Sequence, residues 1–450
     1  MYSRAVHGLQ VYRSMSACPD VAIVGAGFAG LAAARFLATR GVSVELFEAT
    51  DRVGGRARTL HGIVELGPEF IHGCPDATLA LVREAGLATE PVGDSHHRWR
   101  DGALVEEPDL WTRFGRLLEP AAELARQGAA HDVTARAYLE RSAMADDDAT
   151  MFAMLVEGFY AAPLADISIA SVAEDAGGAG GDDAARQSRL AGGYGVLIDW
   201  LARELVRANV PIHFGRVVQA IDYQSDRVRI DYGNHGHHAG DTALARRAIV
   251  TLPLGVLLAN DVRFHPDLGA HADALSRFAM GQVVKVVLCL RDPVWRDHGP
   301  PGLEFVHRRD GTFPTFWCRS TDREHLLTAW AGGPHAHALA GCTQAQLVDR
   351  VVGEFAATLA IPRATLASAI LHEHFHDYAH DPFARGAYSY TRVHGAGAAD
   401  ILARPLAGKV FLAGEVTDAE YEGSVAGAIA SGTRAARQIL DAERSLAAAG

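Results

Sequence analysis

Cysteine is scarce in this sequence. The five cysteines are odd in number, scattered along the chain and without a C-x-x-C pair: Cys18, Cys74, Cys289, Cys318 and Cys342. This usage argues against a disulfide framework and against a cysteine-based zinc site, and a reducing cytoplasm is the simplest setting.

Long apolar runs are absent as well. No stretch approaches the uninterrupted run of about 18 apolar residues that a membrane-spanning helix needs. Residues 1–18 have no continuous apolar core and no clear cleavage site, so we expect a loose extension there and no secretory signal. Basic residues are outnumbered, and the net charge of −12 argues against a nucleic-acid partner and would mildly concentrate cationic substrates.

Residues 21–50 have the pattern of a strand, a glycine turn, a helix and a second strand. Gly25, Gly27 and Gly30 follow the apolar run 21–24 at the G-x-G-x-x-G spacing. The first permits a tight turn, the second lets the backbone approach a diphosphate, and the third lets the helix, expected at about 29–40, pack on the strand. Glu48 ends the second strand, where an acid binds the hydroxyls of an unphosphorylated ribose. These residues together predict a dinucleotide site.

The next residues favour FAD over NAD. Residues 48–56, EATDRVGGR, continue from the ribose acid into a glycine pair with Gly55 and then Arg56. Such a pair can bring backbone N–H groups and a guanidinium to the same diphosphate. This run resembles the FAD-binding start of the flavin amine oxidases, EA-x-x-R-x-GGR. The resemblance extends over about residues 19–443, and its details are most similar to those of polyamine oxidases.

Two later segments resemble motifs of the same family. Residues 63–73, IVELGPEFIHG, are similar to its E-L-G-A-x-W/F-I-H-G segment. The resemblance implies that Gly67 lets the backbone approach the isoalloxazine ring and that His72 faces the substrate cavity; the alternative for His72 is a buried structural histidine. A G-G-x-G-x-L run opens an amphipathic helix through about residue 207, and Val218 then stands where the family contacts adenine.

Lys285 is the single lysine within the apolar run 280–288. A buried ammonium needs a partner, a depressed pKa or a water-lined cavity, unless the strand is at an edge and the amine reaches solvent. The run resembles the family's M-G-x-x-x-K motif, which implies that Lys285 holds a water against flavin N5.

Aromatic residues of 303–334 are expected in the core of a mixed sheet, and only Trp330 is placed near the cavity by resemblance.

The C-terminal part resembles two further motifs. Residues 381–390 match D-P-Y-x-x-G-x-Y-S-Y, which places Tyr388 at the cavity; Ala387 stands where animal monoamine oxidases carry the cysteine bonded to FAD, so the cofactor is expected to be non-covalent. Tyr378 stands where the family often has a tryptophan against the flavin. Residues 411–428 are similar to F-A-G-E followed by G-x-V-x-G-A, which implies flavin contacts from Gly414, Glu415 and Val425, and a small hydroxyl, Ser424, opposite Tyr388.

Acidic and histidine-rich segments leave more than one interpretation open. Glu174 resembles a carboxylate that binds substrate ammonium groups in animal polyamine oxidases; the alternative is a solvated acid. The histidines near 235–238 are expected at a hairpin tip, because no cysteine or carboxylate lies at the spacing of a metal ligand there. The period of two places His372, His374 and His376 on one face of a strand, and the family that the chain resembles uses no metal at this position. No metal is therefore expected.

The predicted fold is α/β, with two domains in 450 residues. A discontinuous Rossmann-like FAD-binding domain is expected from residues 19–75, 188–262 and 383–443. An α+β substrate-binding domain, a mixed sheet flanked by helices, is expected from residues 76–187 and 263–382, and residues 1–18 and 444–450 are expected to be loose. We also expect 75–189 to be helical and 248–258 to form one buried strand with a Pro-Leu-Gly turn.

The resemblance implies a soluble, cytoplasmic FAD-dependent amine oxidase. A hydride equivalent leaves the carbon beside a neutral amine, the imine hydrolyses, and O2 is reduced to H2O2; the cofactor carries this chemistry. Two alternatives remain: a flavin dehydrogenase or desaturase that does not use O2, and a non-catalytic flavin-binding interaction protein. The expected partners are a small amine, possibly a polyamine, and O2; the sequence specifies neither the amine nor the oligomeric state.

Overall fold

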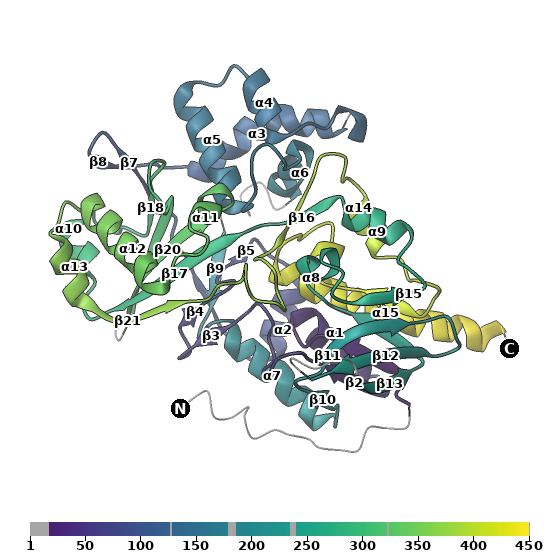
Figure 1. Cartoon of the computed structure of the whole chain (residues 1–450). Coiled ribbons are helices and arrows are strands. Elements are labelled where there is room, and N and C mark those ends of the chain that lie inside the picture. Colours follow the sequence, from purple (N-terminus) through teal and green to yellow (C-terminus); the bar gives the residue numbers. More distant parts are fainter. Residues whose placement is uncertain (1–17, 127, 179–185, 235–239, 322–323, 450) are drawn as a thin grey trace.

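The computed structural model describes residues 18–126, 128–178, 186–234, 240–321 and 324–449. The predicted N-terminal extension, apart from Cys18, and the histidines of 235–239 lie outside these residues. Figure 1 shows a group of helices at the top, a large sheet at the left and the glycine-motif region at the lower right.

The glycine motif belongs to a five-stranded sheet whose neighbouring strands all pair in parallel. Its strands, in spatial order, are β10 (Ile212–His213), β2 (Val44–Phe47), β1 (Val21–Val24), β14 (Arg247–Val250) and β23 (Val410–Leu412). Every residue of β1 and β2 is buried. This explains the continuous apolar run of β1, because a parallel sheet covered on both faces has no solvent side.

Successive side chains of β1 enter two different cores. Val21 and Ile23 pack in the core that contains residues of α1 (Phe28–Ala38), α2 (Asp76–Glu84), α7 (Tyr194–Arg207) and α15 (Val425–Ala449). Ala22 and Val24 pack in a second core with a four-stranded sheet. That sheet consists of β13 (Asp241–Ala245), β12 (Val228–Gly233), β11 (Val217–Asp222) and β15 (Arg263–His265). The parallel sheet is therefore the middle of three layers.

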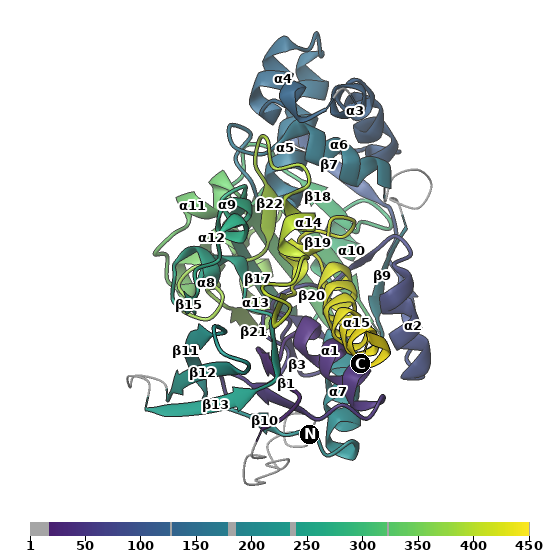
Figure 2. The same ribbon diagram turned by 90° about the vertical axis from the view of Figure 1, so that its right-hand side faces the viewer.

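Helices α1 and α15 lie side by side (Figure 2). A Cβ atom at Gly432 would lie 2.2 Å from the carbonyl oxygen of Ala29, so only glycine permits this approach. The first and last segments of the fold thereby share one core.

A seven-stranded mixed sheet forms the other large part of the molecule. Its strands, in spatial order, are β21 (Ile370–Phe375), β17 (Val283–Leu290), β20 (His325–Gly332), β19 (Thr315–Ser320), β18 (Phe305–His307), β7 (His96–Arg100) and β8 (Ala103–Glu106). One face packs on α12 (Gln344–Thr358) through residues such as Val286 and Phe316. On the other face, Lys285, Trp330 and Thr315 are paired across adjacent strands in one row.

The remaining elements connect or cap these sheets. A helical group, shown at the top of Figure 1, comprises α3 (Leu110–Arg126), the 3-10 helix η2 (Ala129–His131), α4 (Ala135–Arg141), α5 (Asp146–Phe159) and α6 (Ile169–Gly178). Shorter helices are α8 (Leu254–Leu258), α9 (Ala270–Leu275), α10 (Val294–His298), α11 (Pro334–Ala338), α13 (Arg363–Ala369), α14 (Ala398–Leu402) and the 3-10 helix η3 (Glu415–Thr417). The small sheets pair β3 (Thr59–Leu60) with β4 (Val64–Glu65), β16 (Phe278–Met280) with β22 (Ser389–Thr391), and β9 (Gln187–Leu190) with β5 (Ile71–His72) and β6 (Thr89–Pro91).

Two local predictions were wrong. The segment expected to be helical, 75–189, contains β6, β7 and β8, and β7 pairs with β18, more than 200 residues away. Partners so distant leave no local pattern, and tertiary pairing outweighs local propensity. The expected strand at 248–258 ends at Val250, and Pro253 then caps the short helix α8, whose first turn the ring of proline favours.

His372 and His374 lie on β21 as predicted, but His376 follows its end and bonds Asp381 at 2.9 Å. Within the described ranges, no cluster of histidine, cysteine or carboxylate side chains is suited to hold a metal ion.

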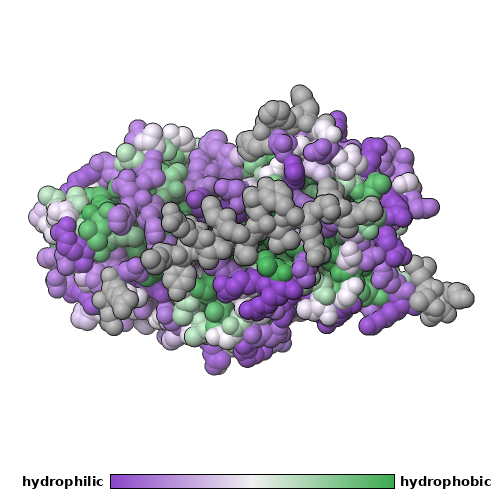
Figure 3. Space-filling model, turned by 90° about the horizontal axis from the view of Figure 1, so that it is seen from below, coloured by the Kyte–Doolittle hydropathy of each residue, from purple (hydrophilic) through white to green (hydrophobic). Residues whose placement is uncertain are grey.

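The molecular face seen from below is mainly hydrophilic, with small scattered hydrophobic areas (Figure 3). Among the helices that the structure describes, none is both long and apolar enough to span a bilayer. The division into two domains with the stated boundaries stays a prediction.

Candidate active site

A cavity of about 1160 Å³ extends from the carboxyl end of β1 to the seven-stranded sheet. Gly25 and Gly27 line it at one end, and Lys285 and Trp330 line it from the sheet. Ligands of parallel α/β sheets bind beyond the carboxyl ends of their strands, so the position agrees with the predicted dinucleotide site.

The glycine turn has the geometry of a phosphate cradle. Gly25 has a φ of +100°, and a Cβ atom at Gly30 would lie 2.0 Å from the carbonyl oxygen of Gly25. No atom lies within 4 Å of the position of a Cβ at Gly27, which faces the cavity and is the N-cap of α1 without a side-chain capping bond. The first N–H groups of α1 are therefore directed at open space, where an anion is favoured. These residues fit a diphosphate.

Glu48 has a fixed orientation beside this turn. Its Oε2 atom accepts a hydrogen bond from the backbone N–H of Ala26 at 2.8 Å, and its Oε1 atom accepts one from that of Thr50 at 2.9 Å. Glu48 is buried and lines the cavity, as does Val218 on β11. The carboxylate retains acceptor capacity for a ribose hydroxyl, because an ionised carboxylate has about four lone-pair sites.

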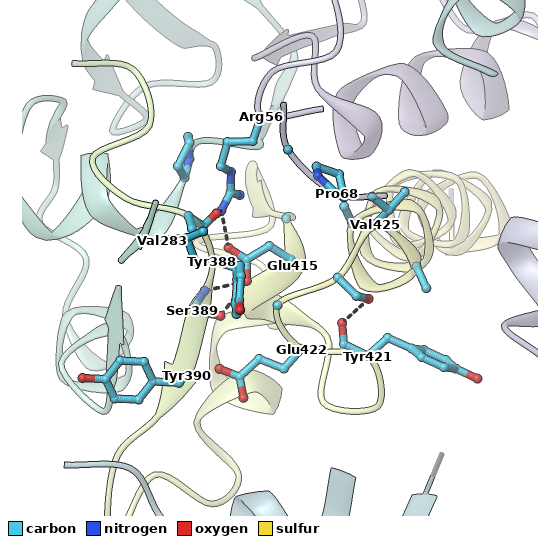
Figure 4. A pocket seen from close by; sticks show the side chains of 18 of the residues that line it. Arg56, Pro68, Val283, Tyr388, Ser389, Tyr390, Glu415, Tyr421, Glu422 and Val425 are labelled. Carbon is cyan, nitrogen blue, oxygen red and sulfur yellow. Dashed lines mark hydrogen bonds and ion pairs between the residues drawn. The ribbon is translucent and has the colours of Figure 1, made fainter. Parts of the chain in front are cut away.

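Arg56 is held by an ion pair inside the protein. Its Nη1 atom donates to Oε1 of Glu415 and to the carbonyl oxygen of Ala387, each at 2.8 Å. Glu415 also accepts a hydrogen bond from Oγ of Ser389 at 2.5 Å. Figure 4 shows Arg56 and Ser389 converging on Glu415. The EATDRVGGR segment and the C-terminal motifs thus meet at one wall of the cavity, where Gly55, Gly414 and Val425 also lie; a contact of Arg56 with the diphosphate stays a prediction.

Gly67 is required by close packing. A Cβ atom at Gly67 would lie 2.1 Å from the carbonyl oxygen of Arg56. Oη of Tyr378 donates to that same oxygen at 2.7 Å. The two residues line the cavity together, where a flavin ring is expected.

Lys285 is buried, with its side chain 4% exposed, and it has an anionic partner. Its Nζ atom lies 2.9 Å from Oε2 of Glu69 and donates to the carbonyl oxygen of Gly67 at 3.2 Å. Oε1 of Glu69 also accepts from Nε of Arg189 at 2.8 Å, and the indole N–H of Trp317 lies 3.1 Å from Oε2. Burial alone would raise the pKa of Glu69, but Lys285 and Arg189 lower it to about 2. The sequence left the partner of Lys285 open, and the structure identifies it.

Aromatic and neutral side chains form the wall around this ion pair. Tyr388 donates to the carbonyl oxygen of Phe159 at 2.7 Å, and the indole N–H of Trp330 donates to that of Gly158 at 2.9 Å. Burial lowers the pKa of His72 to about 4, so this histidine is neutral near pH 7. All three predicted residues line the cavity; their contacts with substrate stay predictions.

Ser424 serves a local purpose that the sequence did not reveal. Its Oγ atom accepts a hydrogen bond from the N–H of Gly427 at 3.0 Å and donates to the carbonyl oxygen of Tyr421 at 2.7 Å. It therefore caps the first turn of α15, although it also lines the cavity.

Carboxylates gather at another part of the cavity wall. Glu174 is exposed there, while Asp175 accepts a hydrogen bond from Oη of Tyr160 at 2.8 Å. Oε2 of Glu422 accepts one from Oγ1 of Thr391 at 2.6 Å, and its Oε1 atom is buried without a hydrogen-bond partner among the described residues. Burial, with the charges of Glu415 and Asp175, raises the pKa of Glu422 to about 7.

Sequence reasoning missed several of these residues: Glu69, Arg189, Asp175, Glu422, and the buried pair His96 and His307, whose rings lie 2.9 Å apart between Nδ1 and Nε2. A signal existed only for Glu69, an ionisable residue inside the apolar segment 63–73. The others come from unrelated parts of the chain and share no local pattern.

Comparison with known proteins decides the family. Residues 28–440 match the model of the flavin-containing amine oxidoreductases. The chain belongs to this family. The predicted family, α/β fold and FAD cofactor are thereby confirmed.

Three relatives illustrate the range of this family. The chain is 26% identical to lysine-specific histone demethylase 1B of Mus musculus, and the match covers 93% of this chain and 52% of the demethylase. It is 27% identical to polyamine oxidase 3 of Oryza sativa subsp. japonica, over 97% of this chain and 92% of that protein. A putrescine oxidase bound to putrescine has the same fold, with a TM-score of 0.78 and 22% identity over 94% and 99% of the two chains. The chain spans about half the length of the histone demethylases that it matches.

Proposed function

We propose that this protein is an FAD-dependent oxidase of amines that uses O2 as the electron acceptor and releases H2O2. One observation carries the proposal: the cavity that begins at the phosphate cradle of Gly25 and Gly27 continues without interruption to Lys285, Tyr388 and Trp330. A cofactor and a substrate can therefore meet inside one cavity.

The cofactor end has a suitable set of groups. Gly25, Gly27 and the N-terminus of α1 would hold the diphosphate, and Glu48 would hold the ribose. When bound there, FAD would supply the hydride acceptor for the carbon beside the amine nitrogen and the electrons that reduce O2. With alanine at position 387, the side chain offers no sulfur for a covalent bond, so we propose that the cofactor is bound non-covalently.

The protein's own groups would bind the amine and exclude water. Tyr388 and Trp330 are fixed by hydrogen bonds to backbone carbonyls, so they form a rigid wall. His72 is neutral and does not repel an incoming ammonium. Lys285 is already paired with Glu69. The side chains of the wall and the cofactor would therefore orient the substrate carbon that donates the hydride.

We further propose that the substrate carries a second positive charge, as diamines and polyamines do. Three further carboxylates line the cavity, those of Glu174, Asp175 and Glu422. Oε1 of Glu422 is buried and has no hydrogen-bond partner among the described residues. A buried carboxylate without a cation is costly, and a substrate ammonium would remove that cost.

The test is an anaerobic screen of amines with the purified, FAD-loaded protein. We expect 1,4-diaminobutane or a longer polyamine to bleach the flavin absorbance, and air to restore it within seconds. Butylamine, which has the same carbon chain and one amine, is the matched control. Reoxidation over minutes would instead indicate a dehydrogenase or desaturase, and an absence of bleaching by any amine would favour a non-catalytic flavin-binding protein.

A further inference from the structure

Glu69 lies where three parts of the fold meet at the cavity. It follows Gly67 by two residues, and its carboxylate receives N–H groups from Lys285 on β17, Arg189 on β9 and Trp317 on β19. Three donors on three separate strands fix the carboxylate in position, because moving it would break all of these bonds at once. Its side chain is 9% exposed.

The ammonium of Lys285 depends on this carboxylate. An unpaired buried ammonium costs several kcal/mol, so it needs an anion in direct contact. Glu65 is the other buried carboxylate nearby, but it accepts its bonds from the N–H of Tyr194 and from Oγ1 of Thr59. Arg189 adds a second positive charge to the cluster. Glu69 is therefore the one carboxylate among the described residues that contacts Lys285.

The bonds of Lys285 also determine its direction. An ammonium has three N–H donors. The described residues account for two of them, through the carbonyl oxygen of Gly67 and the carboxylate of Glu69. The ring of Trp317 lies beneath the ammonium, 5.2 Å from Nζ to the ring centroid. With these three sides occupied, the remaining N–H has a restricted set of directions.

We propose that Glu69 is a positioning residue that anchors the ammonium of Lys285 and so directs its remaining N–H toward the flavin end of the cavity. This inference rests on the proposed function, since Glu69 acts on the reaction only through Lys285. It adds a residue that contacts neither substrate nor the reacting atoms.

A double-mutant cycle tests the proposal with Glu69→Gln, Lys285→Met and the double variant. Gln keeps the size of Glu69 and can still accept from Arg189 and Trp317. The measurements are the rate at which air reoxidises the anaerobically reduced enzyme from pH 6 to 9, the midpoint potential of the bound flavin, FAD content and melting temperature.

We expect Glu69→Gln to slow reoxidation at least about threefold, and the loss to grow as pH rises from 8 to 9, because the buried ammonium no longer has its anion. In the Lys285→Met background the same change should alter neither the rate nor its pH dependence, because interacting sites are not additive. The midpoint potential of the bound flavin should differ between wild type and Glu69→Gln. It should be the same in Lys285→Met and in the double variant.

Among the described residues, the charged groups around Lys285 are Glu65, Glu69 and Arg189, and burial raises the pKa of Glu65 to about 7. Glu65→Gln is therefore the matched control: it should keep the wild-type rate at pH 6, where that carboxyl is already mostly neutral, as glutamine is. If Glu69→Gln fails to fold, Glu69→Asp retains the charge on a shorter stem and should give a rate between those of wild type and Lys285→Met.

Equal slowing by Glu69→Gln in both backgrounds, or a wild-type rate and pH profile, would overturn the inference. Neither result affects the proposed oxidase activity, which fails only if no amine reduces the flavin or if O2 does not reoxidise it.

Discussion

The two ends of the cavity are built in different ways. At the cofactor end, the phosphate cradle consists of backbone groups from one short segment, the turn between β1 and α1 with Gly25, Gly27 and Gly30. The substrate end is assembled from side chains on strands and helices far apart in the chain, as the pair of Lys285 and Glu69, 216 residues apart, illustrates. A site made of backbone tolerates few substitutions and varies little in chemistry, whereas a site made of side chains can change its substrate by single replacements.

This difference explains what could be predicted from the sequence. Glycine spacing, buried strands and Glu48 follow from local rules, so the strands, turn and helix at the start of the fold were predicted closely, while the ligand contacts of these residues stay predictions. Family resemblance identified Lys285, Tyr388 and Trp330 as residues of the substrate end. Glu69, Asp175 and Glu422 escaped because the groups around them at the cavity come from other parts of the chain, and β7 was missed because its partner strand is also distant.

The largest expected effect is at the cofactor end. Glu48→Ala should weaken FAD binding tenfold to a hundred-and-fifty-fold, since a charged hydrogen bond to a ribose hydroxyl contributes about 1.5–3 kcal/mol. Titration of the FAD-free protein with FAD measures the change. Glu48→Gln, which can still accept from Ala26, is the matched control and should lose less. An unchanged affinity in the alanine variant would remove Glu48 from the site.

At the substrate end, Lys285→Met tests the residue at the centre of the ion pair. The substitution keeps the apolar stem, and Glu69 retains Arg189 and Trp317 as partners, so we expect a folded, FAD-loaded protein. Its reoxidation by air should slow at least about tenfold, which corresponds to roughly 1.4 kcal/mol of barrier. Stopped-flow reduction and reoxidation measure both half-reactions. Wild-type rates in both would show that Lys285 is not catalytic, while loss of FAD would indicate a structural role.

A third prediction concerns Glu422 and the second charge of the substrate. Because its pKa is about 7, Glu422 becomes an anion as pH rises through that value, and kcat/KM for 1,4-diaminobutane should rise with it. Glu422→Gln should lower kcat/KM for the diamine about tenfold at pH 8, a change of about 1.4 kcal/mol, and leave butylamine unaffected. Equal losses for both amines would show that Glu422 does not recognise the second charge.

The same carboxylate makes a prediction about stability. The pKa of Glu422 is raised from 4.5 to about 7 in the folded state, so its contribution to stability is present below pH 4.5 and is lost as pH rises to 7. Glu422→Gln should therefore raise the melting temperature relative to wild type at pH 8 and change it less at pH 5. A difference that does not depend on pH would contradict the assigned pKa.

The smallest perturbation concerns the bond between cofactor and protein. Because residue 387 is alanine, acid or heat should release all of the flavin as FAD, which chromatography of the supernatant measures. Flavin that remains with the precipitated protein would contradict a non-covalent site.

The arrangement of the parallel sheet has a consequence for synthesis of the chain. Strand β14 lies between β1 from the first part of the chain and β23 from the last, and α1 packs on α15 through Gly432. A growing chain therefore leaves the ribosome with its glycine turn made early but without the strand and helix that cover it. Because translation proceeds at about 5–20 residues per second, the turn waits tens of seconds before the layer around it is complete. During that interval the unpaired edge of β14 can pair with a wrong strand, and early binding of the cofactor or of a chaperone would protect it.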